Sequence, residues 1–324
     1  MLRALRLMFV AWLATLAARL RGRPRHAGWP FTFELMVRYL RADWDATAGL
    51  PLAELRADMD GRPYPRDFAK RVPMIETALA GVPAMRFVPE GAPANRAILF
   101  FHGGSYIYGS ARTTHAELVA RIAHASGLEV VALDYRLAPE HPYPAQLDDA
   151  LAAFDALVQS GTPPESIVLA GDSAGGNLAI ELQLALRDRG GPQANAAILI
   201  SPWSDLTMPG ASFIDNERYD FGTRDVLVTH AAAFAGAVPL DDPRVSPTYA
   251  KLEGLAPVLI TVGEAEIPRD DVLALASKLK EAGVDVALHV AKGMPHNAPV
   301  FAAYHPEARA ALDAVVAFAR ARLR

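Results

Sequence analysis

From about residue 80 to the end of the chain, short apolar runs alternate with longer segments in which apolar residues recur every three or four positions. This alternation of strand and helix periods predicts an α/β fold around a mostly parallel sheet flanked by helices. Most of the runs are apolar throughout, as expected for strands that are covered on both faces. The expected strands are 85–88, 97–101, 130–135, 167–170, 197–200, 258–262 and 286–290, and the expected helices are 114–125, 145–159, 177–187, 271–282 and 306–323.

Two segments interrupt this alternation. Residues 1–60 predict helices with no strand between them, and residues 203–249 form a long insertion with a helical portion near 225–235. Insertions of this length in a compact domain are usually functional. We expect both segments to cap the carboxyl edge of the sheet, where open α/β sheets bind ligands. The expected organisation is an N-terminal helical cap over 1–60 and a catalytic domain over 61–324, with a cap insertion at about 203–249.

The N-terminal segment has an unusual distribution of charge. Residues 1–25 contain six arginines and no acidic residue, and an almost wholly apolar run lies between them at 7–18. A helix that spans a membrane needs about 20 apolar residues, so we do not expect a transmembrane span. A secretory signal, a helix lying on a membrane surface and a helix packed on the protein's own body stay open, and we favour the last. The expected location is the cytoplasm, with membrane association through residues 1–25 as the alternative.

Composition limits the chemistry. The 324 residues are 52% hydrophobic and 21% charged, which is typical of a folded globular chain. A net charge of −4 offers no basic surface for nucleic acid, so we expect no such partner. Because the chain has no cysteine, it cannot form disulfides, a thiolate nucleophile or a Cys-ligated zinc site. Covalent chemistry must therefore use Ser, Thr, Lys, His, Tyr or a carboxylate.

The clearest chemical motif is the sequence Gly-Asp-Ser-Ala-Gly at 171–175, which directly follows an apolar strand and opens a helix-compatible run. This context is typical of a nucleophile elbow, in which small neighbours let the backbone turn tightly around an exposed serine. A glycine-rich turn that binds phosphate is the alternative. The motif predicts Ser173 as a nucleophile.

A second motif, His-Gly-Gly-Ser at 102–105, follows the strand expected at 97–101. A serine nucleophile needs N–H donors for the negative charge that develops on the carbonyl oxygen. Glycine pairs at this point of the fold commonly supply such donors, together with the residue after the nucleophile. We expect Gly103, Gly104 and Ala174 to form this oxyanion hole.

Serine also needs a general base, which in this fold follows the nucleophile along the chain. His296 lies in a Gly/Pro loop after the last expected strand, so it can reach the carboxyl edge of the sheet. His305 is the alternative, whereas His289 lies within that strand and is expected to be a half-buried structural residue. His115, His124 and His141 precede Ser173 and are expected at the surface or in packing.

The acid that orients this histidine is expected in the loop after 258–262. The loop contains Glu264, Glu266, Asp270 and Asp271. Asp270 and Asp271 suit the first turn of the next helix, where carboxylates favour the helix dipole. Glu266 lies midway in the loop and is the preferred triad acid, with Asp270 and Glu264 as alternatives.

With these residues the chain resembles the hormone-sensitive-lipase-like family of α/β-hydrolase carboxylesterases over about residues 80–322. The resemblance rests on the His-Gly-Gly motif, on the segments 134–145, 171–177 and 263–271, and on the loop that holds His296. It implies an α/β-hydrolase core, a helical cap and hydrolysis of carboxylic esters. It also implies a structural role for 135–145, with Arg136, Glu140 and Asp148 in buried or partly buried pairs.

Two positions depart from the family's usual pattern. Ser105 stands where the family usually has a third glycine, and the acid position resembles the subgroup that uses Glu in place of Asp. The donors of the oxyanion hole are expected to survive the first change.

These observations predict a serine carboxylesterase that hydrolyses small-molecule esters of short to medium acyl chain through Ser173, His296 and Glu266. No metal or organic cofactor is required by this chemistry. A lactone hydrolase using the same residues is the first alternative, and a non-catalytic protein that binds a small molecule on the same fold is the second. The resemblance also implies a homodimer through the last strand and helix.

Overall fold

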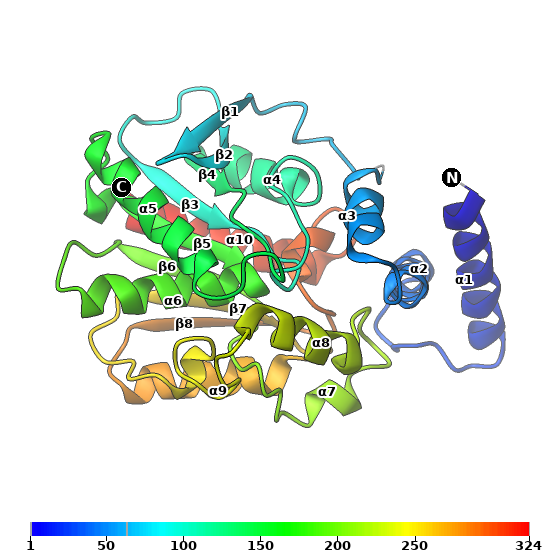
Figure 1. Ribbon diagram of the computed structural model, residues 1–324. Helices are drawn as coiled ribbons and strands as arrows, with labels where there is room; N and C mark the ends of the chain where they lie inside the picture. Colours follow the sequence, from blue (N-terminus) through cyan, green and yellow to red (C-terminus); the bar gives the residue numbers. More distant parts are fainter. Residues whose placement is uncertain (1, 63, 324) are drawn as a thin grey trace.

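The computed structural model describes residues 2–62 and 64–323, and an eight-stranded sheet forms its centre (Figure 1). The strand order is β1-β2-β4-β3-β5-β6-β7-β8. β2 is antiparallel to both of its neighbours, and every other pair is parallel. The strands are β1 (Met74–Leu79), β2 (Val82–Phe87), β3 (Ala97–Phe101), β4 (Glu129–Leu133), β5 (Ile167–Asp172), β6 (Ala196–Ile200), β7 (Val258–Gly263) and β8 (Val286–Ala291).

Helices cover both faces of this sheet. The helices are α1 (Leu2–Leu20), α2 (Phe31–Thr47), α3 (Leu52–Asp60), α4 (Ala116–Ser126), α5 (Ala145–Gln159), α6 (Ala174–Asp188), α7 (Ser212–Asp215), α8 (Arg224–Ala235), α9 (Arg269–Glu281) and α10 (Pro306–Arg322). Short 3₁₀ turns η1 (Pro164–Ser166), η2 (Pro247–Tyr249) and η3 (Ala298–Phe301) complete the set. The predicted α/β fold is confirmed, and all seven predicted strands are present, with β3 at its predicted ends and the other six shifted at one end or both.

Strand β1 was not predicted. Its residues are all half-buried or exposed and include Glu76 and Thr77, because it lies at the edge of the sheet and pairs only with β2. β1 therefore lacks the continuous apolar run by which the other strands were predicted. The pairing expected for Asp148 is also wrong, since Arg136 binds the carboxylate of Asp149 one position later and Asp148 is exposed.

The alternating side chains of the strands form two separate cores. On β3, Leu99 and Phe101 face a cluster with α5, α6 and α9, whereas Ile98 and Phe100 face a second cluster with α4 and α10. All four side chains are fully buried. Burying apolar surface on both faces fixes the register of the parallel strands. Their carboxyl ends consequently meet at one edge, which is the edge that carries the candidate site.

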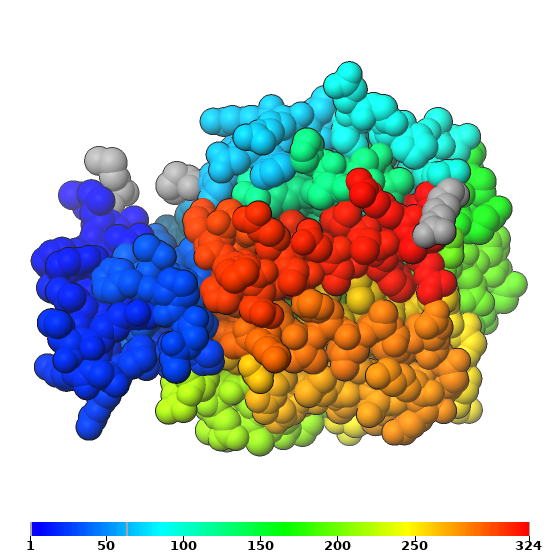
Figure 2. Space-filling view, turned by 180° about the vertical axis from the view of Figure 1, so that it is seen from behind, coloured from blue at the N-terminus to red at the C-terminus, as the bar shows by residue number. Residues whose placement is uncertain are grey.

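The N-terminal helices and α8 lie beyond this carboxyl edge (Figure 1). α1 is the outermost element and packs against α2, which lies between α1 and the rest of the molecule. Seen from behind, the N-terminal helices project from one side of the body (Figure 2). Among the described helices, none has the length and apolar character required to cross a membrane.

Candidate active site

Ser173 occupies a strained turn between β5 and α6. Its backbone has φ 54° and ψ −118°, which a residue with a side chain rarely adopts, and its N–H donates to the carbonyl oxygen of Ile200 at 2.8 Å. The turn packs closely against β3, and Gly175 permits this because a Cβ at that position would overlap the carbonyl oxygen of Phe101. This is the local geometry of a nucleophile elbow, which presents the serine at the carboxyl edge of the sheet.

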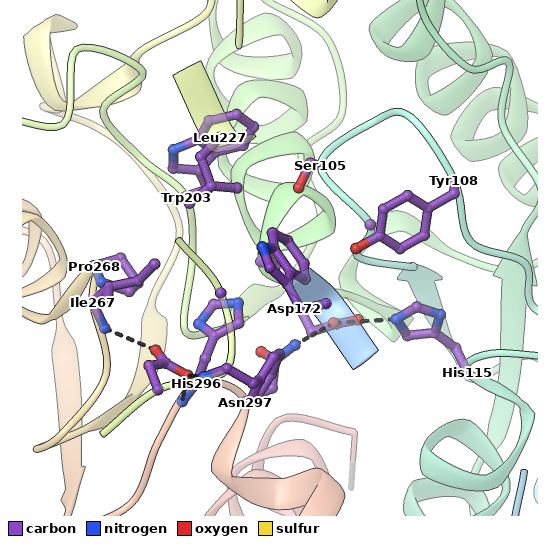
Figure 3. A pocket seen from close by; sticks show the side chains of 16 residues that line it. Ser105, Tyr108, His115, Asp172, Trp203, Leu227, Ile267, Pro268, His296 and Asn297 are labelled. Atoms are coloured by element: carbon purple, nitrogen blue, oxygen red, sulfur yellow. Dashed lines mark hydrogen bonds and ion pairs between the residues drawn. The ribbon is translucent and has the colours of Figure 1, made fainter. Parts of the chain in front are cut away.

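The side chain of Ser173 lines a cavity of about 150 Å³. Figure 3 shows this cavity with His296 and Asn297 on one side and Tyr108 and His115 on the other. Its wall combines elements that are distant in the sequence. The apolar lining comes from Trp44 of α2, Leu227 of α8 and the loop residues Trp203, Phe221 and Ile267.

His296 and Glu266 approach each other below the cavity. The imidazole Nδ1 of His296 lies 3.4 Å from the carboxylate Oε2 of Glu266. Such contacts are often long in an unliganded site and shorten when substrate binds. Glu266 is fully buried, and its Oε2 also accepts a hydrogen bond from the hydroxyl of Ser201 at 2.7 Å. The two loops that follow β7 and β8 thus bring these side chains together.

Burial and charge act in opposite directions on this pair. Burial alone would lower the pKa of His296, but the hydrogen bond and negative charge of Glu266, with the charge of Asp220, raise it above its ordinary value. Burial raises the pKa of Glu266, and contact with His296 and Ser201 partly offsets this effect. A positive imidazole is therefore favoured next to Glu266, as a general base requires after it has taken a proton.

The other predicted acids lie elsewhere. Glu264 is exposed, and its carboxylate accepts the N–H of Gly293 at 2.8 Å. Asp270 and Asp271 lie in the first turn of α9, and Asp270 accepts the N–H of Ser212 at 2.9 Å. Of the four predicted carboxylates, Glu266 is therefore the one in contact with His296.

The alternative histidines are also separated from this pair. His305 begins α10 and accepts the N–H of Glu307, and its ring packs on Phe33. His289 is half-buried on β8, as expected. His124 and His141 are exposed.

The expected oxyanion hole differs from the structure at one position. The N–H of Gly103 donates to the carboxylate of Asp172 at 3.0 Å, so it does not point into the cavity, and Gly103 is not part of the lining. Gly104 and Ser105 do line the cavity, and their N–H groups meet no acceptor among the described residues. Ala174 is the first residue of α6, where the N–H has no partner within the helix. The available donors are therefore Gly104, Ser105 and Ala174.

Comparison with known proteins agrees with this geometry. A family model described as the α/β-hydrolase fold matches residues 98–300. An acetyl-hydrolase from Streptomyces hygroscopicus is 38% identical over 77% of this chain and 83% of its own, and an esterase from Acinetobacter venetianus is 37% identical over 70% and 76%. The crystal structure of an esterase from the bacterial hormone-sensitive lipase family has a TM-score of 0.81 and 35% identity, over 89% of this chain and 98% of that one. The chain belongs to the hormone-sensitive-lipase family of α/β-hydrolase esterases.

Membership confirms the predicted family and the enzyme class, and it leaves the alternative of a non-catalytic binding protein without support. Among the described residues of this esterase, no group of three or more His, Cys, Asp or Glu side chains is placed to hold a metal ion.

In this esterase, Asp220 is a site residue that the sequence did not reveal. It comes from the insertion at 203–249, and its carboxylate is fully buried. It accepts the N–H groups of Phe221 at 2.8 Å, Ile267 at 2.9 Å and His296 at 3.2 Å. Asp220 therefore ties the insertion to the two loops that carry Glu266 and His296.

A second polar cluster, also missed, surrounds Asp172 of the esterase. The carboxylate of Asp172 accepts the side-chain N–H of Asn297 at 2.7 Å and lies 3.3 Å from Nε2 of His115 (Figure 3). Burial acts to raise the pKa of Asp172, but His115, His102 and the N–H of Gly103 together lower it. His115 is half-buried and packs against this carboxylate from the start of α4, which agrees with the packing alternative expected for it.

Proposed function

We propose that this esterase hydrolyses carboxylic esters of short to medium acyl chain, with Ser173 as nucleophile, His296 as general base and Glu266 as the acid that orients His296. The observation that carries the proposal is the contact between His296 at the Ser173 cavity and the buried Glu266. It supplies the base and the orienting carboxylate that an otherwise weak serine nucleophile needs.

In the proposed cycle, Oγ of Ser173 attacks the ester carbonyl carbon while His296 takes its proton. The tetrahedral intermediate collapses as the imidazolium returns this proton to the leaving alcohol, which leaves an acyl-enzyme. Water activated by His296 then attacks the acyl carbon and releases the carboxylic acid and the free serine. The N–H groups of Gly104, Ser105 and Ala174 would stabilise both oxyanions, each donor contributing about 2.7–4 kcal/mol.

Two cavities meet at His296. The small cavity holds Ser173, Gly104 and Ser105, and a larger one of about 870 Å³ shares His296 and Asn297 with it. Ser173, Gly104 and Ser105, which hold the acyl carbon and its oxygen, line the small cavity and not the large one, whereas His296, which gives its proton to the leaving oxygen, lines both. We therefore assign the acyl group to the small cavity and the alcohol group to the large one, whose lining includes Met36, Leu40 and Phe301.

We expect turnover to depend strongly on acyl length and weakly on the size of the alcohol. With p-nitrophenyl esters from acetate to palmitate, kcat/KM should peak at short or medium acyl chains, while acetate esters of progressively larger alcohols should be hydrolysed at similar rates. Leu40→Trp, which narrows the large cavity, should raise KM for the acetate of a bulky alcohol and spare p-nitrophenyl acetate. The opposite ranking, with long acyl chains preferred, would reverse the assignment of the cavities.

Lactones are the second substrate class that this site could take. A lactone is an internal ester whose alcohol and acyl parts stay joined, so it would have to occupy both cavities at their junction beside His296. Faster turnover of a lactone than of any open ester in the same series would favour this alternative.

We further propose that residues 2–60 and 203–249 act as a cap. Trp44 and Leu227 from these segments line the Ser173 cavity, which supports the assignment. The proposed setting is the cytoplasm, with a membrane contact through the N-terminal residues. A homodimer through β8 is supported by its position at the edge of the sheet and by the exposed side chains of Leu288 and Val290.

Asp220→Asn should reduce kcat and shift the pH profile. The amide can no longer accept all three backbone N–H groups, and a negative charge that raises the pKa of His296 is lost. The acid limb of kcat/KM, which reports the His296 pKa, should therefore move to lower pH. Asp242→Asn is the matched control, at a half-buried position outside both cavities whose carboxylate contacts Arg244 alone among the described residues. An unshifted acid limb in Asp220→Asn would show that Asp220 does not act on His296.

A further inference from the structure

Helix α1 presents most of its large apolar side chains to solvent, while the two residues that it buries against the protein are small. Ala11 and Thr15 are the buried residues of α1, on the side that faces α2. Of sixteen exposed large apolar side chains in the described chain, eight lie on this one helix. They are Leu2, Leu5, Met8, Phe9, Val10, Trp12, Leu13 and Leu20, with exposed fractions from 41% for Met8 and Trp12 to 83% for Leu2. A surface helix normally has the reverse arrangement.

The arginines of this segment fall into two groups. Arg3 pairs with Asp43 and Asp58, Arg19 pairs with the buried Glu34, and Arg25 donates to backbone carbonyls of the insertion. These three hold the helix on the protein. Arg6, Arg21 and Arg23 are exposed and form no ion pair among the described residues, and no acidic residue lies between 1 and 25 to balance them.

We propose that α1 binds this esterase to an anionic lipid surface, with its apolar face in the acyl boundary and Arg6, Arg21 and Arg23 on the headgroups. Such a surface has an apolar acyl region, which matches the exposed apolar side chains of α1, and anionic headgroups, which match its unbalanced arginines. A second copy of the chain would match the apolar side chains alone, because pairing two α1 helices would bring like charges together. The projection of the N-terminal helices from the body leaves room for this contact (Figure 2).

The proposal rests on the proposed function and narrows its substrate class. Arg3, Ala4 and Met8 of α1 line the large cavity, and that cavity reaches His296. An esterase docked through α1 would therefore receive the alcohol part of its substrate from the lipid side. The substrate class that follows is a short-chain ester of a lipid-soluble or amphiphilic alcohol.

The contact is tested by co-sedimentation of the full chain with vesicles of phosphatidylcholine alone and with added phosphatidylglycerol. The wild type should bind the anionic vesicles, and Phe9→Gln with Leu13→Gln should weaken binding at least about tenfold, because two large apolar side chains no longer insert. Arg6→Gln with Arg21→Gln should weaken binding to anionic vesicles by more than about tenfold, since each arginine near the surface contributes about fivefold. Ile75→Gln with Ile214→Gln removes equally exposed apolar side chains away from α1 and should bind like the wild type.

Vesicle binding and catalysis are measured separately. The substituted positions 6, 9, 13, 21, 75 and 214 line neither cavity, so all three double variants should keep their turnover of soluble p-nitrophenyl acetate. Conversely, Ser173→Ala should lose this turnover and bind vesicles like the wild type. Wild-type protein that stays in the supernatant, or a Phe9/Leu13 variant that binds equally well, would overturn the proposal whatever the activity. A dimer that this variant dissociates, without any vesicle binding, would assign the face to a second copy instead.

Discussion

Ser173→Ala should lower kcat for p-nitrophenyl acetate by about 10⁴- to 10⁶-fold. The change removes the atom that forms the acyl-enzyme, and no other hydroxyl stands at the turn between β5 and α6. What activity remains should come from the N–H donors and His296 acting on a bound water molecule. Initial rates at saturating substrate, together with the loss of the burst of p-nitrophenol, measure the effect.

The fold of this variant should be unchanged. Alanine has the same Cβ as serine, so it adopts the strained φ of 54° at no greater cost. Equal unfolding temperatures of the variant and the wild type would establish this. Ser166→Ala in the remote turn η1 is the matched control and should keep full activity. A Ser173→Ala enzyme that turns over within tenfold of the wild type would refute the acyl-enzyme mechanism.

The sequence was sufficient for the parts of the site that depend on local rules. A glycine-rich turn between a buried strand and a helix predicts the elbow at Ser173, and a Gly/Pro loop after the last parallel strand predicts the position of His296. Both follow from chain order and strand ends, which periodicity reveals. The same reasoning placed the helical portion of the insertion, found as α8.

Contacts between distant segments could not be predicted in this way. Gly103 and Ser105 both belong to a plausible donor motif, and only the position of Asp172 decides which N–H faces the cavity. Asp220 looks like any polar residue of an insertion until its carboxylate is seen to accept three backbone N–H groups. Periodicity did not reveal which side of α1 faces the protein either, because apolar residues surround that helix.

Glu266→Gln should lower kcat by about 10²- to 10⁴-fold. The side chains have the same shape, and the hydroxyl of Ser201 and Nδ1 of His296 both contact the position of Oε2. With the amide oxygen there, His296 loses the negative charge that stabilises its protonated form. With the amide nitrogen there, donation to Nδ1 selects the tautomer that cannot take the proton of Ser173. Glu264→Gln is the matched control, because it changes a neighbouring exposed carboxylate of the same loop.

The pH profile separates this role from simple structural damage. Glu266 raises the pKa of His296 through a hydrogen bond and through its charge, so Glu266→Gln should lower that pKa. The fraction of neutral His296 at acidic pH then increases, and the acid limb of kcat/KM moves to lower pH while the plateau falls. Damage to the fold would lower the plateau without moving the limb. If Glu264→Gln or Asp270→Asn produced the shift and Glu266→Gln did not, the triad acid would have to be reassigned to that residue, against the 3.4 Å contact between Glu266 and His296.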